Sequence, residues 1–176
     1  MWSEEGPLRY ERLTWPEVAR AAGQGRVALI PGATLEDHGP HLPVDTDLRI
    51  VSEICERAAA RAADRVVLLP AIPHGYDPHH MDFPGAISVG WDTFVRYCTD
   101  VGRSLAHHGF RRMLFLNGHG SNQNLVETAA RLVMVERPEI LAAAALSVSI
   151  RAMASLIAPT NAAMTLGLAS WKVVVL

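Results

Sequence analysis

Four short runs of apolar residues recur along the chain, and none shows the strict apolar–polar alternation of a strand with one wet face. Near-continuous apolar runs of this length are typical of strands that are buried on both faces, as in a parallel sheet. This feature constrains the fold more strongly than any other. The predicted strands cover residues 26–30, 65–70, 112–116 and 143–150.

Helical patterns lie between these runs. We expect Asp47 to cap the start of the first helix, Gly109 to end the second and Ser121 to cap the third. The alternation of strand and helix predicts an α/β fold with a mostly parallel sheet. The predicted helices cover residues 47–63, 92–109 and 121–138.

The composition is that of a globular protein with one core. The chain has 176 residues, of which 49% are hydrophobic, and a formal net charge of -2. That charge offers no basic field for nucleic acid or an anionic membrane.

Cys55 and Cys98 lie among apolar residues without metal-type spacing, so we expect two buried thiols and a reducing compartment. The charged N-terminal residues 1–13 lack an apolar signal core, which favours a cytoplasmic protein.

Polar segments follow three of the predicted strands, at residues 32–47, 71–85 and 117–124. In a parallel sheet, all three leave the carboxyl ends of their strands, which is the edge where open α/β sheets bind ligands. The segments thereby bring six of the eight histidines to one rim. These are His38, His41, His74, His79, His80 and His119.

Imidazole and carboxylate groups together predict a site for Zn²⁺, Mn²⁺ or Fe²⁺. Residues two apart in an extended segment point the same way, so Glu36 and His38 face one site and Asp37 turns away. Asp47, at the mouth of the next helix, is the best-placed carboxylate for sharing between two ions. His119 follows a strand between two glycines, which allow close approach.

Structural roles compete with this interpretation. The aspartates of the first segment suit turns and caps, and a single histidine is more often a surface or core residue than a ligand. His107 and His108 lie at a helix end, where a positive charge is favourable, so we interpret both as structural. The clustering of ligand types on three separate loops is what favours the metal site.

Two other function classes remain open from the residues alone. The segment "NGHGSNQN" places a glycine-containing turn before a helix, which suits an anion- or nucleotide-binding module. The apolar tail keeps a non-catalytic oligomerising subunit open. Neither a Gly-x-Gly-x-x-Gly fingerprint nor a Walker lysine motif follows the first strand.

Three segments resemble the signatures of the creatininase (creatinine amidohydrolase) family. "PGATLEDHGPHLPVDTD" looks like its Glu-Gln-His-Gly-x-His-Leu-Pro segment, and "FLNGHGSNQN" resembles its Asn-Gly-His-Gly-x-Asn motif. "PHGYDPHHMDFPGAISV" resembles the segment between them, and the order agrees. The likeness extends from about residue 10 to about residue 140.

The resemblance implies a three-layer α/β/α fold, a homo-oligomer and one or two divalent ions (Zn, Mn or Fe). It implies hydrolysis of a small non-peptide amide, cyclic or formyl, through attack by metal-bound hydroxide. The family's metal ligands fall on Glu36, His38, Asp47 and His119, the four residues that spacing had selected. The predicted partner is this small amide, with neither nucleic acid nor membrane.

The chain departs from the family pattern in three places. Asp37 replaces a glutamine and Ala86 a threonine, and we expect little effect from Asp37. The family's later His-Ala-Gly-x-x-x-Glu-Thr-Ser motif, whose glutamate completes the metal site, has no counterpart. Substitutes would be His80 or Asp82, or less favourably Glu127, and we take His80 as the auxiliary residue. A degenerate member with a partial metal site is therefore the alternative function.

Residues 141–176 differ in composition from the predicted family domain over 1–140. Past residue 140 the only charges are Arg151 and Lys172. We interpret the segment as the truncated or frame-shifted end of the domain. A swapped interface helix and a membrane span over 152–171 are weaker alternatives.

Overall fold

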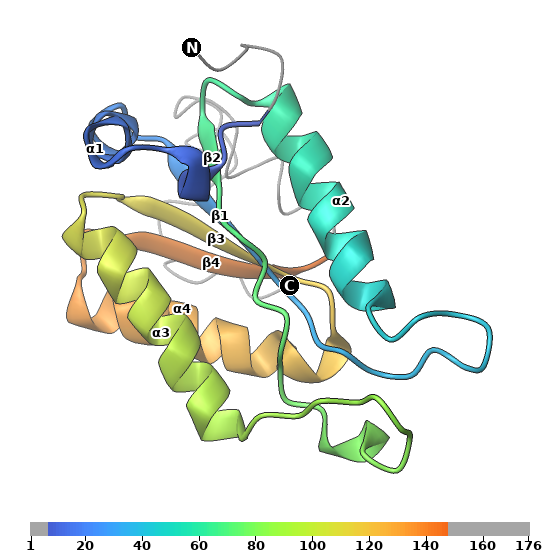
Figure 1. Ribbon diagram of the computed structural model, residues 1–176. Coiled ribbons are helices and arrows are strands. Elements are labelled where there is room, and N and C mark those ends of the chain that lie inside the picture. Colours follow the sequence, from blue (N-terminus) through green and yellow to red (C-terminus); the bar gives the residue numbers. More distant parts are fainter. Residues whose placement is uncertain (1–6, 148–176) are drawn as a thin grey trace, which may run out of the picture.

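The computed structural model describes residues 7–147, which form one sheet with helices on both faces (Figure 1). The sheet has four strands in the order β2-β1-β3-β4, and every pairing is parallel. This confirms the predicted α/β class and the parallel sheet. The strands are β1 (Val27–Gly32), β2 (Val66–Leu68), β3 (Arg112–Asn117) and β4 (Leu141–Leu146).

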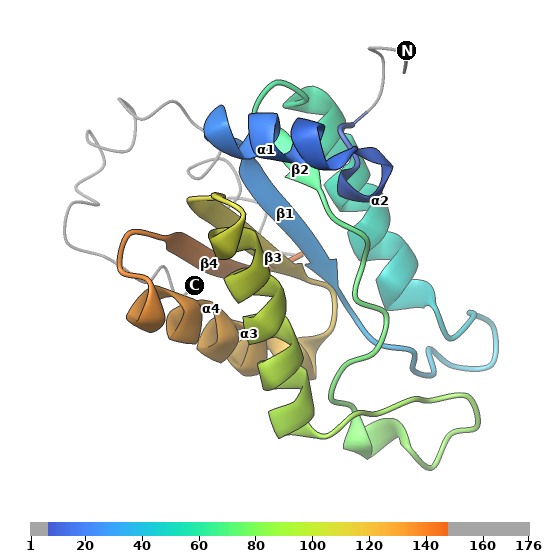
Figure 2. The ribbon, with the colours of Figure 1, turned by 60° about the vertical axis from the view of Figure 1, so that its left-hand side comes forward.

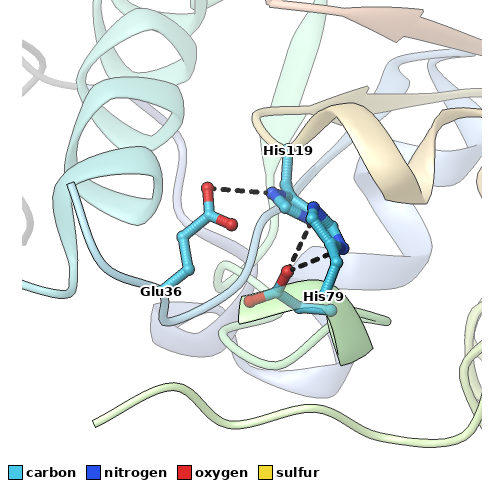
Figure 3. A group of neighbouring side chains, drawn as sticks. Glu36, His79 and His119 are labelled. Atoms are coloured by element: carbon cyan, nitrogen blue, oxygen red, sulfur yellow. Dashed lines mark hydrogen bonds and ion pairs between the residues drawn. The ribbon is translucent and has the colours of Figure 1, made fainter. Parts of the chain in front are cut away.

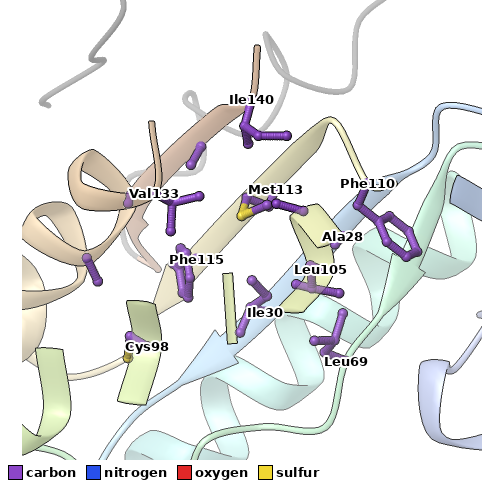
Figure 4. Close-up of a cluster of buried hydrophobic side chains, with 14 of the residues drawn as sticks. Ala28, Ile30, Leu69, Cys98, Leu105, Phe110, Met113, Phe115, Val133 and Ile140 are labelled. Carbon is purple, nitrogen blue, oxygen red and sulfur yellow. The ribbon is translucent and has the colours of Figure 1, made fainter. Parts of the chain in front are cut away.

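Alternate residues of each strand enter different cores. Ala28 and Ile30 of β1 pack toward α3 and α4, whereas Val27 and Leu29 pack toward α2. Figure 4 shows the first core, where Phe115 of β3 lies near helix residues. Burial on both faces explains why the strands read as continuous apolar runs. Figures 1 and 2 show α2 on one side of the sheet and α3 with α4 on the other, which gives the three-layer arrangement.

The helices differ from the predicted ones mainly at their ends. Figure 1 labels α1 (Trp15–Gly23), α2 (Thr46–Arg61), α3 (Trp91–His107) and α4 (Gln123–Glu136). Helix α3, which was predicted over 92–109, ends as expected, because Gly109 has a positive φ of 95° just beyond it. Helix α1 was not predicted from the sequence. Of its nine residues, only two alanines are buried.

Two predicted caps are wrong. Asp45 is the N-cap residue of α2, and Asp47 lies inside the first turn, where its carboxylate turns to histidines outside the helix. Ser121 belongs to a 3-10 turn, η3 (Gly120–Asn122), and Asn122 precedes α4. The Asp47 carboxylate contacts His38 and His119 instead of capping the helix, and the Ser121 hydroxyl lies 3.5 Å from His79 Nε2.

Several other predictions concern the edges of the described region. Strand β4 begins directly after residue 140 and pairs along its length with β3. The division into a domain over 1–140 and a tail stays a prediction, because residues 148–176 lie outside the described part. The candidate membrane span and part of the strand predicted over 143–150 also lie there.

Both cysteines are buried, as expected, and burial raises the pKa of each thiol to about 12. No helix within residues 7–147 has the length and apolar character needed to cross a bilayer.

Candidate metal centre

The four predicted ligands converge at the carboxyl edge of the sheet. His119 Nδ1 lies 3.1 Å from Glu36 Oε1 and 3.4 Å from Asp47 Oδ2. His38 Nε2 lies 3.2 Å from Asp47 Oδ1 and 3.8 Å from Glu36 Oε1. Glu36 and His119 are buried, at 6% and 4% exposure, and the other two are partly covered. The structure therefore brings together residues that are separated by up to 83 positions.

Gly118 allows α2 and the loop after β3 to approach each other. A Cβ on this residue would lie 2.9 Å from Val51 Cβ and 3.1 Å from the Asp47 carbonyl oxygen. The backbone of Gly118 also donates a hydrogen bond of 2.7 Å to the carbonyl of Gly32 at the end of β1. The expected close approach thus occurs at Gly118 and not at Gly120, which has open space around it.

Two buried asparagines hold the loops in place. The Asn117 side chain accepts a hydrogen bond from the His119 N–H at 3.1 Å and donates one to the His119 carbonyl at 2.6 Å. Asn122 accepts from the Tyr76 N–H at 2.9 Å and donates to the Ala33 carbonyl at 3.3 Å. Asn122 therefore joins all three polar segments, and the backbone of His119 is clamped before any ligand binds.

Two further side chains, Asp77 and His79, extend the cluster. His79 Nδ1 lies 3.4 Å from Asp77 Oδ1, and His119 Nε2 lies 3.6 Å from the same oxygen. Figure 3 shows the ring of His79 against that of His119, with Glu36 reaching His119 from the loop after β1; the two rings stack with centroids 6.0 Å apart. Asp77 was not among the predicted residues, although it repeats the two-residue spacing of Glu36 and His38.

The auxiliary histidine, His80, lies at the rim of the cluster. Its Nε2 is 3.5 Å from Glu36 Oε2, and its Nδ1 is 2.5 Å from Asp37 Oδ1. Asp37 therefore does not join the four ligands but orients His80, which gives it a larger role than expected. The other suggested substitutes lie elsewhere: Asp82 is exposed, and Glu127 accepts a hydrogen bond from Gln123 on α4.

Not every histidine of the three segments reaches the cluster. His41 is exposed on the first loop. His74 lines a separate pocket of about 400 Å³ with apolar residues such as Ile72 and Tyr97. Only part of the predicted histidine rim therefore belongs to one site.

The buried charges shift one another's protonation. Burial raises the pKa of Glu36, and the nearby Asp47 and Asp77 carboxylates add to the rise. Burial opposes the charge of Asp47 too, but hydrogen bonds to His119 and Glu36 outweigh it and lower its pKa. For His119, burial disfavours the cation, whereas Asp47 and the negative charges around the ring raise its pKa. The cluster is thus an acidic pocket that favours positive charge.

The donor set fits a divalent first-row cation. Within residues 7–147, several buried atoms at the cluster have no hydrogen-bond partner: Glu36 Oε2, both carboxylate oxygens of Asp77, and His119 Nε2. Such orphaned atoms are costly unless something else binds them. Two ligands on one tetrahedral ion with bonds of roughly 2.0–2.2 Å lie about 3.3–3.6 Å apart. The spacings of 3.1–3.8 Å among the four predicted ligands lie close to this range.

Comparisons with known proteins agree with this geometry. The family model described as creatinine amidohydrolase matches residues 11–167, which is further than the resemblance to about residue 140. A mycofactocin precursor peptide peptidase of Mycobacterium tuberculosis is 36% identical over 116 residues, covering 61% of this chain and 46% of the relative. A creatinine amidohydrolase of Pseudomonas putida is 32% identical over 130 residues, covering 70% of this chain and 49% of that protein.

Solved structures show the same likeness. A creatinine amidohydrolase (creatininase) crystal structure superposes with a TM-score of 0.75 at 28% identity, covering 82% of this chain and 58% of the other. A structure named "Creatininase Mn" gives a TM-score of 0.74 at 27% identity, covering 80% and 58%. The chain spans about half the length of the curated relatives it matches. Since the family model matches most of the sequence, the chain belongs to the creatininase family.

Proposed function

We propose that the chain is a metal-dependent amidohydrolase that hydrolyses a small non-peptide amide, cyclic or formyl. The observation that carries this proposal is that His38 and His119 both lie against the carboxylates of Glu36 and Asp47, at 3.1–3.8 Å. These residues would hold a Zn, Mn or Fe ion. The names of the two relatives, a peptidase and an amidohydrolase, both describe cleavage of C–N bonds. The name of the manganese structure supports a first-row cation.

The chain's own residues prepare the site for this chemistry. A bound divalent cation would supply Lewis-acid polarisation of the amide carbonyl and would acidify a water molecule. Asn117 fixes the backbone of His119, so the ring stays in position. The hydrogen bond to Asp37 raises the pKa of His80, so the cation, with a proton on Nε2 beside Glu36, persists to a higher pH than in a free histidine. That proton is available to a leaving amine.

An anion-binding module is less well supported by the site. The loop that contains "NGHGSNQN" faces Glu36 and Asp47 through His119. A phosphate there would meet two carboxylates at short range, which is unfavourable.

The test is metal content together with hydrolysis. The purified chain, loaded with Zn²⁺, Mn²⁺ or Fe²⁺, is incubated with creatinine, an N-formyl compound and a short peptide, and products are detected by mass spectrometry. We expect bound metal and cleavage of at least one amide. Asp47→Asn should weaken metal binding by more than the roughly 10–100-fold that loss of an outer-shell partner costs.

The exposed His107→Ala variant is the matched control, because His107 lies at the opposite end of α3 from the cluster. Metal binding that Asp47→Asn leaves unchanged would contradict the proposed site. Stoichiometric metal without cleavage of any of the three amides would favour the degenerate family member. Phosphate binding that survives chelation would favour the anion-binding module.

A further inference from the structure

Two large apolar side chains, Met81 and Phe83, form an exposed apolar rim beside the candidate metal centre. They lie in the loop between the 3-10 turn η2 (Pro78–His80) and α3, and their exposed fractions are 53% and 51%. Single exposed apolar residues are ordinary on a protein surface. These two are different because they directly follow His80, which borders the cluster of proposed ligands.

The ring of Phe83 lies against the ring of His80. The two ring centroids are 6.2 Å apart, and the Phe83 N–H donates a hydrogen bond of 2.9 Å to the His80 carbonyl. His80 Nε2 in turn lies 3.5 Å from Glu36 Oε2. One side chain therefore separates the Phe83 ring from a proposed metal ligand. A ligand that extends from the centre past His80 meets the Phe83 ring next.

The turn that carries Phe83 is anchored to the neighbouring loop. The Ile87 N–H donates a hydrogen bond of 3.0 Å to the Leu35 carbonyl. Gly85 has a positive φ of 102° and packs so closely that an added Cβ would lie 3.1 Å from Val44 Cγ1. Figures 1 and 2 show the loop after β1 and the loop before α3 side by side. The rim is thus preorganised, which lowers the entropy cost of binding a ligand.

We propose that this rim is the subsite for an apolar substituent on the nitrogen side of the scissile amide. The inference rests on the proposed function, in which the leaving amine departs beside His80. The amine and its substituent then lie on the side of the centre where the Phe83 ring is exposed. The substrate class is therefore an N-alkyl or N-aryl amide, such as a formamide with an apolar amine part.

The charges around the rim disfavour an anionic substituent. Asp82 is exposed between the two rim residues, and Asp37 Oδ1 lies 2.5 Å from His80 Nδ1. A carboxylate or phosphate on the substituent would meet these like charges. An uncharged alkyl or aryl group avoids this repulsion and buries apolar surface on Phe83. Each methylene that it buries should strengthen binding by about two- to fourfold.

Chain-length dependence tests the proposal. The zinc-loaded full chain is given N-methyl-, N-butyl- and N-hexylformamide, and the released formate is measured. We expect kcat/KM to rise by about two- to fourfold per methylene. Phe83→Ala should abolish this rise, whereas Phe83→Leu should keep most of it. Val135→Ala is the matched control, because Val135 is also exposed and apolar but lies in the last turn of α4, at the far end of that helix from His119.

Binding of the product amines gives a readout that needs no hydrolysis. Methyl-, butyl- and hexylammonium are titrated into the metal-free chain by calorimetry, where the acidic cluster attracts the ammonium group. Affinity should rise with chain length in the wild type and in Val135→Ala, but not in Phe83→Ala. A purely structural role of Phe83 would instead lower the melting temperature of Phe83→Ala and leave the chain-length dependence in place.

The outcomes separate the subsite from the proposed function. Hydrolysis without chain-length dependence, or a dependence that Phe83→Ala leaves intact, would overturn the subsite alone. Amine binding that depends on chain length and on Phe83, without hydrolysis of any formamide, would count against the activity and support the subsite. Neither hydrolysis nor chain-length-dependent binding would overturn both.

Discussion

At the scale of single residues, Gly118 sets the distance between Asp47 and His119, two of the proposed metal ligands. It separates the first turn of α2, which carries Asp47, from the loop that carries His119, and an added Cβ would meet Val51 at 2.9 Å. We expect Gly118→Ala to lower the free energy of unfolding by about 1–3 kcal/mol, the usual cost of overpacking. It should also weaken metal binding, because the two ligands move apart. Chemical denaturation and a Zn²⁺ titration measure the two effects.

Gly120→Ala is the matched control for this prediction. The two glycines flank the same histidine, but nothing lies within 4 Å of a Cβ on Gly120. Its effect on stability should stay within about 0.5 kcal/mol. Equal losses in the two variants would show that the loop needs glycine for its flexibility and not for the close contact with α2.

The sequence predicts some site residues better than others. Glu36 and His38 could be paired because they are two apart in an extended segment, Asp47 because it lies at the start of the next helix, and His119 because it follows a strand. Asp77 precedes Pro78 in a loop, where an aspartate usually serves a turn, so its complete burial was not predictable. The signal that could have found it is the repeated carboxylate–x–histidine spacing, at residues 36–38 and 77–79.

At the scale of elements, one ion pair joins α3 to α4 on the surface. Arg103 Nε donates to Glu136 Oε2 at 2.7 Å, and the guanidinium beside it lowers the pKa of Glu136 below its usual 4.5. A lowered pKa in the folded state means that the pair stabilises the protein above about pH 4.5. This stability is lost as the pH falls through the folded-state pKa.

We therefore expect the melting temperature of Glu136→Gln to lie below that of the wild type near neutral pH. The difference should shrink steadily as the solution is acidified below the usual pKa of glutamate, since the wild-type carboxylate then becomes neutral too. Scanning calorimetry over a pH series measures it. Glu53→Gln is the control, because Glu53 pairs with Arg57 inside α2 and joins no two elements. A Glu136→Gln difference that grows on acidification would contradict this interpretation.

Elements were predictable where burial is strongest. Strands β1 and β3 lie in the middle of the sheet, and their apolar runs marked both within two residues. The edge strand β4 starts two residues earlier than predicted, since an edge position buries it less evenly. Helix α1 lies at the periphery, has nine residues and buries only Ala21 and Ala22, so it lacks the longer apolar stripe by which the other helices were predicted.

At the scale of the whole molecule, metal binding should couple to global stability. A ligand present at about 100 times its Kd stabilises the folded state by about 2.7 kcal/mol. For a domain of this size, that corresponds to roughly 5–10 °C in melting temperature. We expect a chelator to lower the melting temperature of the metal-loaded chain by an amount of this order, as measured by scanning calorimetry.

Glu36→Gln tests the origin of that shift. The substitution keeps the size of the side chain but removes a negative charge that faces both His119 and His38. Its response to chelator should be much smaller than that of the wild type. An undiminished response would place the stabilising ion elsewhere in the protein.

The parallel order of the sheet has a consequence for biosynthesis. Glu36 and His119 follow β1 and β3, which are neighbours in the sheet although α2, β2 and α3 lie between them in the sequence. During translation His119 leaves the ribosome long after Glu36, so an early intermediate lacks one of the proposed ligands. Cation binding should consequently follow the pairing of β3 with β1.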